Sequence, residues 1–123
     1  MVIFSDFGKL ILRLSLSIMM LTHGLAKINK LFAEEINFSD PIGLGPLNSL
    51  ILVAFAEFIA PIFIIVGYKT KWFALFPFIA MAVVVFFVHW DDPFGRKEKA
   101  LLYMFGFLVV FLIGPGKYSL EKE

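Results

Sequence analysis

The chain has 123 residues, of which 60% are hydrophobic and 17% are charged, and its mean hydropathy is +0.90. A soluble domain of this length carries about 45–50% apolar and about 25% charged residues, so the composition excludes an ordinary soluble domain and indicates a membrane protein. The formal net charge of +1 gives no sign of nucleic-acid binding, and the lack of cysteine excludes disulfides, Fe–S clusters and Cys-ligated zinc within the chain.

Four apolar stretches follow one another along the chain, separated by charged residues and by segments rich in Pro and Gly. A transmembrane helix needs about 20 mostly apolar residues, so these stretches predict four membrane-spanning helices. We expect the helices at residues 8–29, 47–67, 72–90 and 98–114. The predicted fold is therefore an all-α integral membrane four-helix bundle, in which residues 1–123 form a single transmembrane domain.

The first predicted helix carries Arg13 about one turn from its start, and His23 and Lys27 near its end. Ionisable groups at membrane depth are costly, so they usually face the interior of a bundle and have partners there. Arg13 is predicted to form a structural ion pair with Glu57 of the second helix. The alternative is that its long side chain reaches the lipid headgroups.

Glu57 lies about ten residues into the second predicted helix, which places it about 15 Å deep, near the bilayer midplane. Pro61, four residues later, has no N–H group and leaves the backbone carbonyl of Glu57 without its helical donor. One interpretation is a kinked helix whose carboxylate is held in an ion pair. The other is that Glu57 transfers protons or binds a ligand.

The third and fourth predicted helices bring further polar side chains to one end of the bundle. Helices one and three run in the same direction, so His89 reaches the membrane face that His23 approaches, and Tyr103 lies about one turn into the fourth helix from that face. Titratable groups that converge in an apolar bundle are typical of a binding site. We therefore predict one ligand site, formed by His23, Lys27, Glu57, His89 and Tyr103.

Hydrogen-bond donors beside aromatic walls suit a quinone head group or another small apolar ligand. A haem between His23 and His89 is less well supported because the two residues differ in depth, and the spacing of the ionisable residues predicts no metal site. A structural alternative stays open. In that case His89 and Trp90 would form an interfacial pair, and His23 would be a hydrogen-bonded core residue.

Several short motifs resemble the DoxX family of small membrane proteins. They are Leu12-Arg13-Leu14 and Thr22-His23-Gly24-Leu25-Ala26-Lys27, Glu57 followed by Gly67-Tyr68-Lys69-Thr70, Val88-His89-Trp90, and Gly114-Pro115-Gly116-Lys117-Tyr118-Ser119-Leu120. The resemblance implies a four-helix bundle in a bacterial or archaeal inner membrane. It also implies links to quinone-coupled sulfur oxidation, as in thiosulfate:quinone oxidoreductase, and to complexes that handle oxidative or thiol stress. The family-like polar residues are Arg13, His23, Gly24, Lys27, Glu57 and His89.

The leading functional hypothesis is a quinone-facing membrane subunit of a redox or oxidative-stress complex, with any catalytic activity of its own left open. Because the chain has no cysteine, a bound cofactor such as quinone and an external electron donor would have to supply the redox chemistry. The alternatives are a non-enzymatic membrane scaffold or assembly protein and, with less support, a small transporter. Expected partners are the lipid bilayer and either another protein or further copies of this chain, without nucleic acid.

Four spans place both termini on the same side of the membrane. Six Lys and Arg residues lie on that side and five on the other, so the positive-inside rule is nearly balanced. We predict cytoplasmic termini, because Lys69 and Lys71 lie in a short turn on the terminal side and the opposite loops are acidic.

Overall fold

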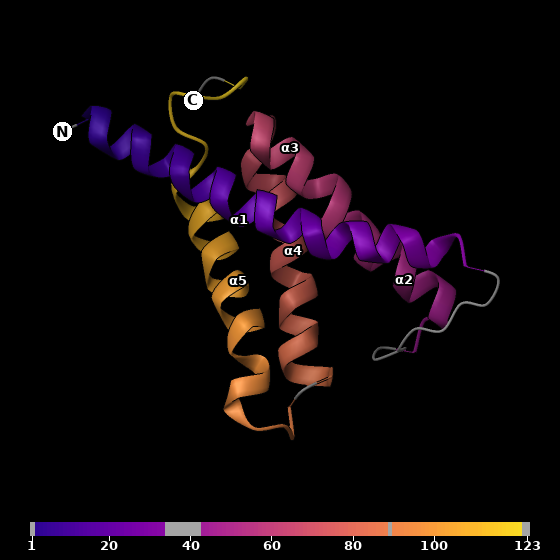
Figure 1. The fold of residues 1–123 in the computed structure, drawn as a ribbon. Coiled ribbons are helices and arrows are strands. Elements are labelled where there is room, and N and C mark those ends of the chain that lie inside the picture. Colours follow the sequence, from indigo (N-terminus) through magenta and orange to yellow (C-terminus); the bar gives the residue numbers. More distant parts are fainter. Residues whose placement is uncertain (1, 34–42, 89, 122–123) are drawn as a thin grey trace.

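The computed structural model describes residues 2–33, 43–88 and 90–121, and all regular structure in this part of the chain is helical. The chain forms four helical rods in the order that the sequence predicts (Figure 1). They are α1 (Val2–Leu31), α2–η1–α3 (Pro46–Ala54, Phe55–Ile59 and Ala60–Val66), α4–η2 (Thr70–Val83 and Val84–Val88) and α5 (Phe94–Ile113). The all-α fold class is therefore confirmed.

Two of the rods begin four or more residues earlier than predicted. α1 starts at Val2 instead of residue 8, and α5 starts at Phe94 instead of residue 98. Pro93 is the N-cap of α5, and its lack of an N–H group and restricted φ suit a helix start. The charged residues that follow it therefore belong to the helix and not to the preceding loop.

Gly and Pro mark several further rod ends within one residue of the predicted positions. Gly67, with a φ of 78°, ends α3 in the left-handed conformation, and its N–H and that of Tyr68 bond to the carbonyl of Phe63. Gly114, also with a φ of 78°, ends α5. Pro46 opens α2 directly after Gly45. Gly67 keeps the turn between α3 and α4 short.

The second rod changes to π-helical geometry at Phe55–Ile59, where Glu57 lies and just before Pro61. The N–H of Ala60 there bonds to the carbonyl of Phe55, five residues earlier. A π-helical turn widens the rod locally and is frequent at functional sites. The sequence suggests a kink near Glu57 because of Pro61, and the structure has a π-helical segment at this level.

Three of the rods are long and apolar enough to cross a membrane: Phe4–Leu31, Pro46–Val66 and Thr70–Val88. α5 differs because Arg96, Lys97, Glu98 and Lys99 occupy its first turns. Its apolar part, residues 100–113, is about 21 Å long at 1.5 Å per residue, which is shorter than a bilayer core of about 30 Å. The three apolar helices support a multi-pass membrane protein, in which α5 is a further helix that packs against α4–η2 and α1.

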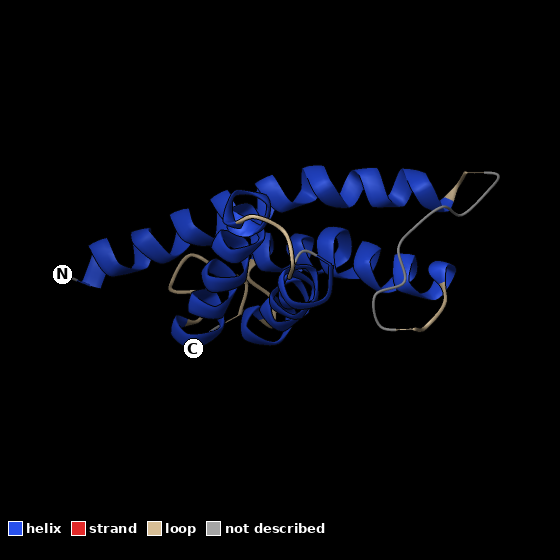
Figure 2. Ribbon diagram, turned by 90° about the horizontal axis from the view of Figure 1, so that it is seen from below, coloured by secondary structure: helices blue, strands red, loops and turns tan. Residues whose placement is uncertain are grey.

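The rods form two antiparallel pairs that cross one another. α4 and α5 make one hairpin, and α1 runs beside α2–η1–α3 and across that hairpin (Figure 1). Figure 2 shows α1, which starts at the N label, along one side of the other helices. The core lies where the two pairs meet and includes Met20, Ile64, Ala74, Met104 and Phe107. Next to this core, the angle between the pairs leaves a pocket.

Candidate functional site

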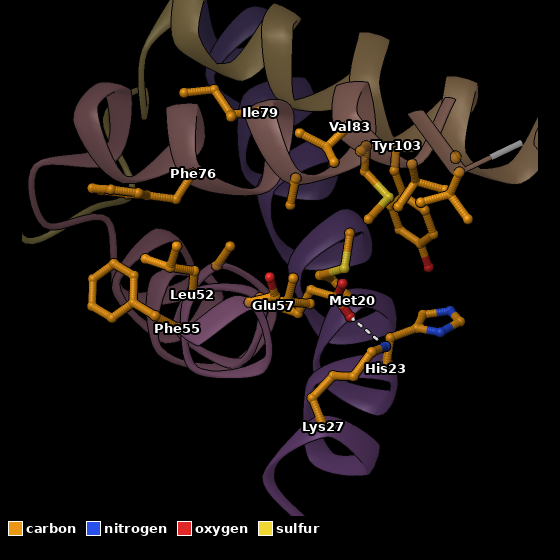
Figure 3. A pocket seen from close by; sticks show the side chains of 18 of the residues that line it. Met20, His23, Lys27, Leu52, Phe55, Glu57, Phe76, Ile79, Val83 and Tyr103 are labelled. Atoms are coloured by element: carbon orange, nitrogen blue, oxygen red, sulfur yellow. Dashed lines mark hydrogen bonds and ion pairs between the residues drawn. The ribbon is translucent and has the colours of Figure 1, made fainter. Parts of the chain in front are cut away.

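A pocket of about 570 Å³ lies between α1, the α2–η1 rod, α4–η2 and α5 (Figure 3). Most of its lining is apolar, and several of these side chains are exposed, among them Leu52, Phe76 and Ile79. An apolar ligand can therefore reach the pocket from the side. The ionisable side chains in the lining are His23, Lys27, Glu57, Arg96, Lys99 and Tyr103.

Glu57 and Lys27 form the one ion pair among the described residues. Lys27 Nζ lies 3.3 Å from Glu57 Oε1 and donates a hydrogen bond to it. The side chain of Glu57 is 4% exposed and that of Lys27 is 20% exposed. A buried carboxylate needs such a partner because it loses its hydration. Lys27 provides this partner from α1 while its stem stays in the pocket lining.

Gly24 allows this ion pair to form. A Cβ at residue 24 would overlap the backbone carbonyl of Glu57 and lie 2.7 Å from the backbone nitrogen of Phe58. The backbones of α1 and η1 therefore touch at Gly24, as small residues permit in membrane helix pairs. Lys27, about one turn later on α1, is within reach of Glu57 because of this contact.

His23 and Tyr103 meet across the pocket. Their ring centroids are 5.8 Å apart and the ring planes are at 85°, an edge-to-face contact. Neither side chain makes a hydrogen bond to any described residue, although Tyr103 is 8% exposed. Figure 3 shows the Tyr103 hydroxyl on the side of the pocket that holds His23 and Lys27. These donors are thus available to a ligand.

The structure brings together four of the five residues predicted for the ligand site: His23, Lys27, Glu57 and Tyr103. The fifth, His89, lies outside the described residues, so its part in the site stays a prediction. That a ligand binds at all is likewise still a prediction.

Arg96 and Lys99 were not among the predicted site residues; the prediction placed Arg96 before the fourth helix and Lys99 at its start. In the structure they line the pocket with Tyr103 from one face of α5, at positions i, i+3 and i+7. Met20, His23 and Lys27 show the same spacing on α1. This spacing is the signal that could have identified the two cations, once the helix start at Phe94 was known.

The predicted ion pair between Arg13 and Glu57 is wrong. The guanidinium of Arg13 donates to the carbonyl of Ile64, at 3.2 Å, and to the carbonyl of Tyr118. Lys27, the actual partner of Glu57, is 14 residues further along α1, about 21 Å away along the helix axis. Arg13 is 1% exposed, so the alternative, in which it reaches the headgroups, does not hold either.

Arg13 instead holds the C-terminal segment, residues 114–121, against the turn between α3 and α4. Leu120 and Glu121 donate their N–H groups to the carbonyls of Val66 and Gly67, both at 3.0 Å. The carboxylate of Glu121 accepts the N–H of Thr70 at 2.7 Å. The role of Arg13 in the described structure is therefore to fasten the chain end, at a distance from the pocket.

Comparison with known proteins gives two matches. A sequence model of the DoxX family matches residues 8–90. The inner membrane protein YqjF of Escherichia coli (strain K12) is 29% identical over 123 residues, covering 95% of this chain and 92% of the relative. No solved structure matches the chain significantly. The family match includes His23, Lys27 and Glu57, whereas the part of the pocket formed by α5 lies beyond it.

Proposed function

The chain belongs to the DoxX family, and from this we propose that it is an inner-membrane protein whose pocket binds a quinone or a similar small apolar carbonyl compound. In this proposal it is the quinone-facing subunit of a redox or oxidative-stress complex. The observation that carries the proposal is the pairing of unused hydrogen-bond donors with apolar walls in one laterally open pocket.

The side chains present fit a quinone. Its two carbonyl oxygens accept hydrogen bonds, and its ring is flat and apolar. The pocket offers the Tyr103 hydroxyl, the His23 ring and the Lys27 ammonium as donors. Phe55 and Phe76 contribute aromatic walls. Their rings meet edge to face, with the ring centroids 5.0 Å apart. The volume of about 570 Å³ lies within the range of about 300–1,000 Å³ typical of small-molecule sites.

A bound quinone supplies the capacity to take up two electrons and two protons. The residues of this chain would orient it and handle protons. Tyr103 and Lys27 would direct the carbonyl oxygens, and the Glu57–Lys27 pair holds a proton donor beside a proton acceptor at the base of the pocket. The electrons would come from a partner protein, because the chain contains no cysteine.

The test is to purify the protein in mild detergent, extract its lipids and quantify quinone. Decylubiquinone and menadione are then titrated, and the melting temperature is followed. We expect co-purified quinone and a rise in melting temperature. Tyr103→Phe, which removes one donor, should weaken binding about two- to tenfold. Tyr118→Phe is the matched control, because Tyr118 is 43% exposed and does not line the pocket.

The proposal fails if no quinone co-purifies and neither compound changes the melting temperature. It also fails if Tyr103→Phe and Tyr118→Phe bind quinone equally well. Intact complex assembly without any quinone binding would favour the scaffold alternative.

A further inference from the structure

The pocket carries more positive charge than its own carboxylate balances. Three cationic side chains, Lys27, Arg96 and Lys99, and one carboxylate, Glu57, line it. Lys27 is paired with Glu57, and Lys30 and Lys99 also act electrostatically on that carboxylate. Among the described residues, neither Arg96 nor Lys99 forms an ion pair. The wall formed by α5 therefore offers two cations to an anion.

We expect these two cations to lie at the level of the membrane interface. They are in the first turns of α5, directly before its apolar part. Trp90 and Phe94 beside them are 58% and 63% exposed, and exposed aromatic residues at the end of a membrane helix are typical of the headgroup region. The positive end of the dipole of a 20-residue helix adds to the attraction for an anion.

An apolar strip leads away from the cations. α5 packs against η2 and α4 in an antiparallel hairpin, so Val88 and Val84 lie near the start of α5 and Phe76 lies further from it. Ile79 and Ala80 lie between Val84 and Phe76 along the strip, and together with Val88 all five of these residues line the pocket. From residue 88 to residue 76 the strip is about 18 Å long. One leaflet of a bilayer core is about 15 Å thick, so the strip matches one acyl chain in length.

We propose that this side of the pocket binds an acidic phospholipid. The phosphate lies between Arg96 and Lys99, and one acyl chain follows the strip from Val88 to Phe76. Charge complementarity selects an acidic lipid, and the strip selects a lipid over free phosphate. The lipid phosphate and the quinone carbonyls use different polar side chains, Arg96 and Lys99 for the one and Tyr103 and His23 for the other, while both ligands would share the apolar wall at Phe76.

The experiment measures lipid retention by native mass spectrometry of the detergent-purified full chain, together with its melting temperature. The probes are dioleoyl phosphatidylglycerol, dioleoyl phosphatidylcholine and inorganic phosphate. We expect phosphatidylglycerol to be retained and to raise the melting temperature, and the other two to have little effect. Arg96→Gln with Lys99→Gln should weaken phosphatidylglycerol binding about 30-fold, since each interfacial cation contributes about fivefold.

The matched control is Lys71→Gln with Lys117→Gln, which removes the same charge from two exposed residues outside the pocket. Arg96→Lys with Lys99→Arg keeps both charges and should keep the lipid. Equal phosphatidylglycerol binding by the Arg96/Lys99 and control variants would overturn the proposal. So would equal retention of phosphatidylcholine, or an equal stabilisation by inorganic phosphate. Quinone content in the same preparations is scored separately, so failure of one proposal leaves the other testable.

Discussion

Among the described residues, Lys27 is the ion-pair partner of Glu57, and Lys30 and Lys99 act on the carboxylate from further away. The carboxylate is buried, and its Oε1 atom lies 3.3 Å from Lys27 Nζ. Removing one member of a buried pair is costly because the other charge is left without compensation, whereas replacing both members is often tolerated. The two substitutions should therefore be strongly coupled.

We predict that Lys27→Met lowers the free energy of unfolding by about 3 kcal/mol, and that adding Glu57→Gln recovers most of this loss. The measurement is a double-mutant cycle from unfolding curves in one detergent. Lys71→Met, at an exposed position of α4, is the control and should stay within about 0.5 kcal/mol of wild type. Simple additivity of Lys27→Met and Glu57→Gln would show that the pair is not coupled.

At the scale of single residues, the sequence predicted which side chains lie close together where the reasoning needed only helix direction and depth. His23, Lys27, Glu57 and Tyr103 fall into this class. The partners of Arg13 could not be predicted, because both are backbone carbonyls, one from Ile64 in α3 and one from Tyr118 in the C-terminal segment. A hydrogen bond from a side chain to a backbone carbonyl leaves no periodic signal in a sequence, because any residue can supply the carbonyl. Lys27 was likewise placed in the site but not recognised as the partner of Glu57.

At the scale of helices, the contact between α1 and η1 positions one wall of the pocket. It depends on Gly24, since the atoms that a Cβ would meet are backbone atoms, which cannot move aside as a flexible side chain can. Gly8, in the same helix, has no atom within 4 Å of the position a Cβ would take. The two glycines therefore form a natural pair for comparison.

We predict that Gly24→Ala lowers the free energy of unfolding by about 1–3 kcal/mol, because the two rods must separate. Gly8→Ala should be neutral or stabilising by up to about 1 kcal/mol, as expected for an exposed helical glycine. Unfolding in detergent measures both, and the quinone assay shows whether the pocket survives in Gly24→Ala. A Gly24→Ala protein as stable as Gly8→Ala would contradict the close contact of α1 and η1.

The rods themselves were predictable because apolar length and Gly/Pro punctuation are local properties. Their ends differ from the prediction by two residues or fewer, except at the starts of α1 and α5. The crossing of the two pairs was not predictable, because it depends on which faces touch, such as Gly24 against η1. The pocket between the pairs is a consequence of that crossing.

At the scale of the whole molecule, the two ends of the helix bundle define the path of the chain through the bilayer. The start of α1 and the C-terminal segment, residues 114–121, lie at the same end of the molecule (Figure 1), and the N–H of Lys117 bonds to the carboxylate of Asp6 at 3.2 Å. The other end of the α4–α5 hairpin carries Gly95. If α5 crosses the membrane despite its short apolar part, Gly95 and Lys117 must lie on opposite sides.

The lack of cysteine makes this directly measurable, because any introduced thiol is the only one in the chain. We predict that Ser5→Cys and Lys117→Cys react with a membrane-impermeant maleimide only after cell lysis, whereas Gly95→Cys reacts in intact spheroplasts. Positions 5, 95 and 117 are all exposed, so differences in labelling report the side of the membrane. Labelling of Gly95→Cys and Lys117→Cys from the same side would mean that α5 does not cross, and labelling of all three in the reverse pattern would place the termini outside. Because Arg96 is the next residue after Gly95, the same result decides which leaflet supplies the acidic lipid that we propose for this end of the pocket.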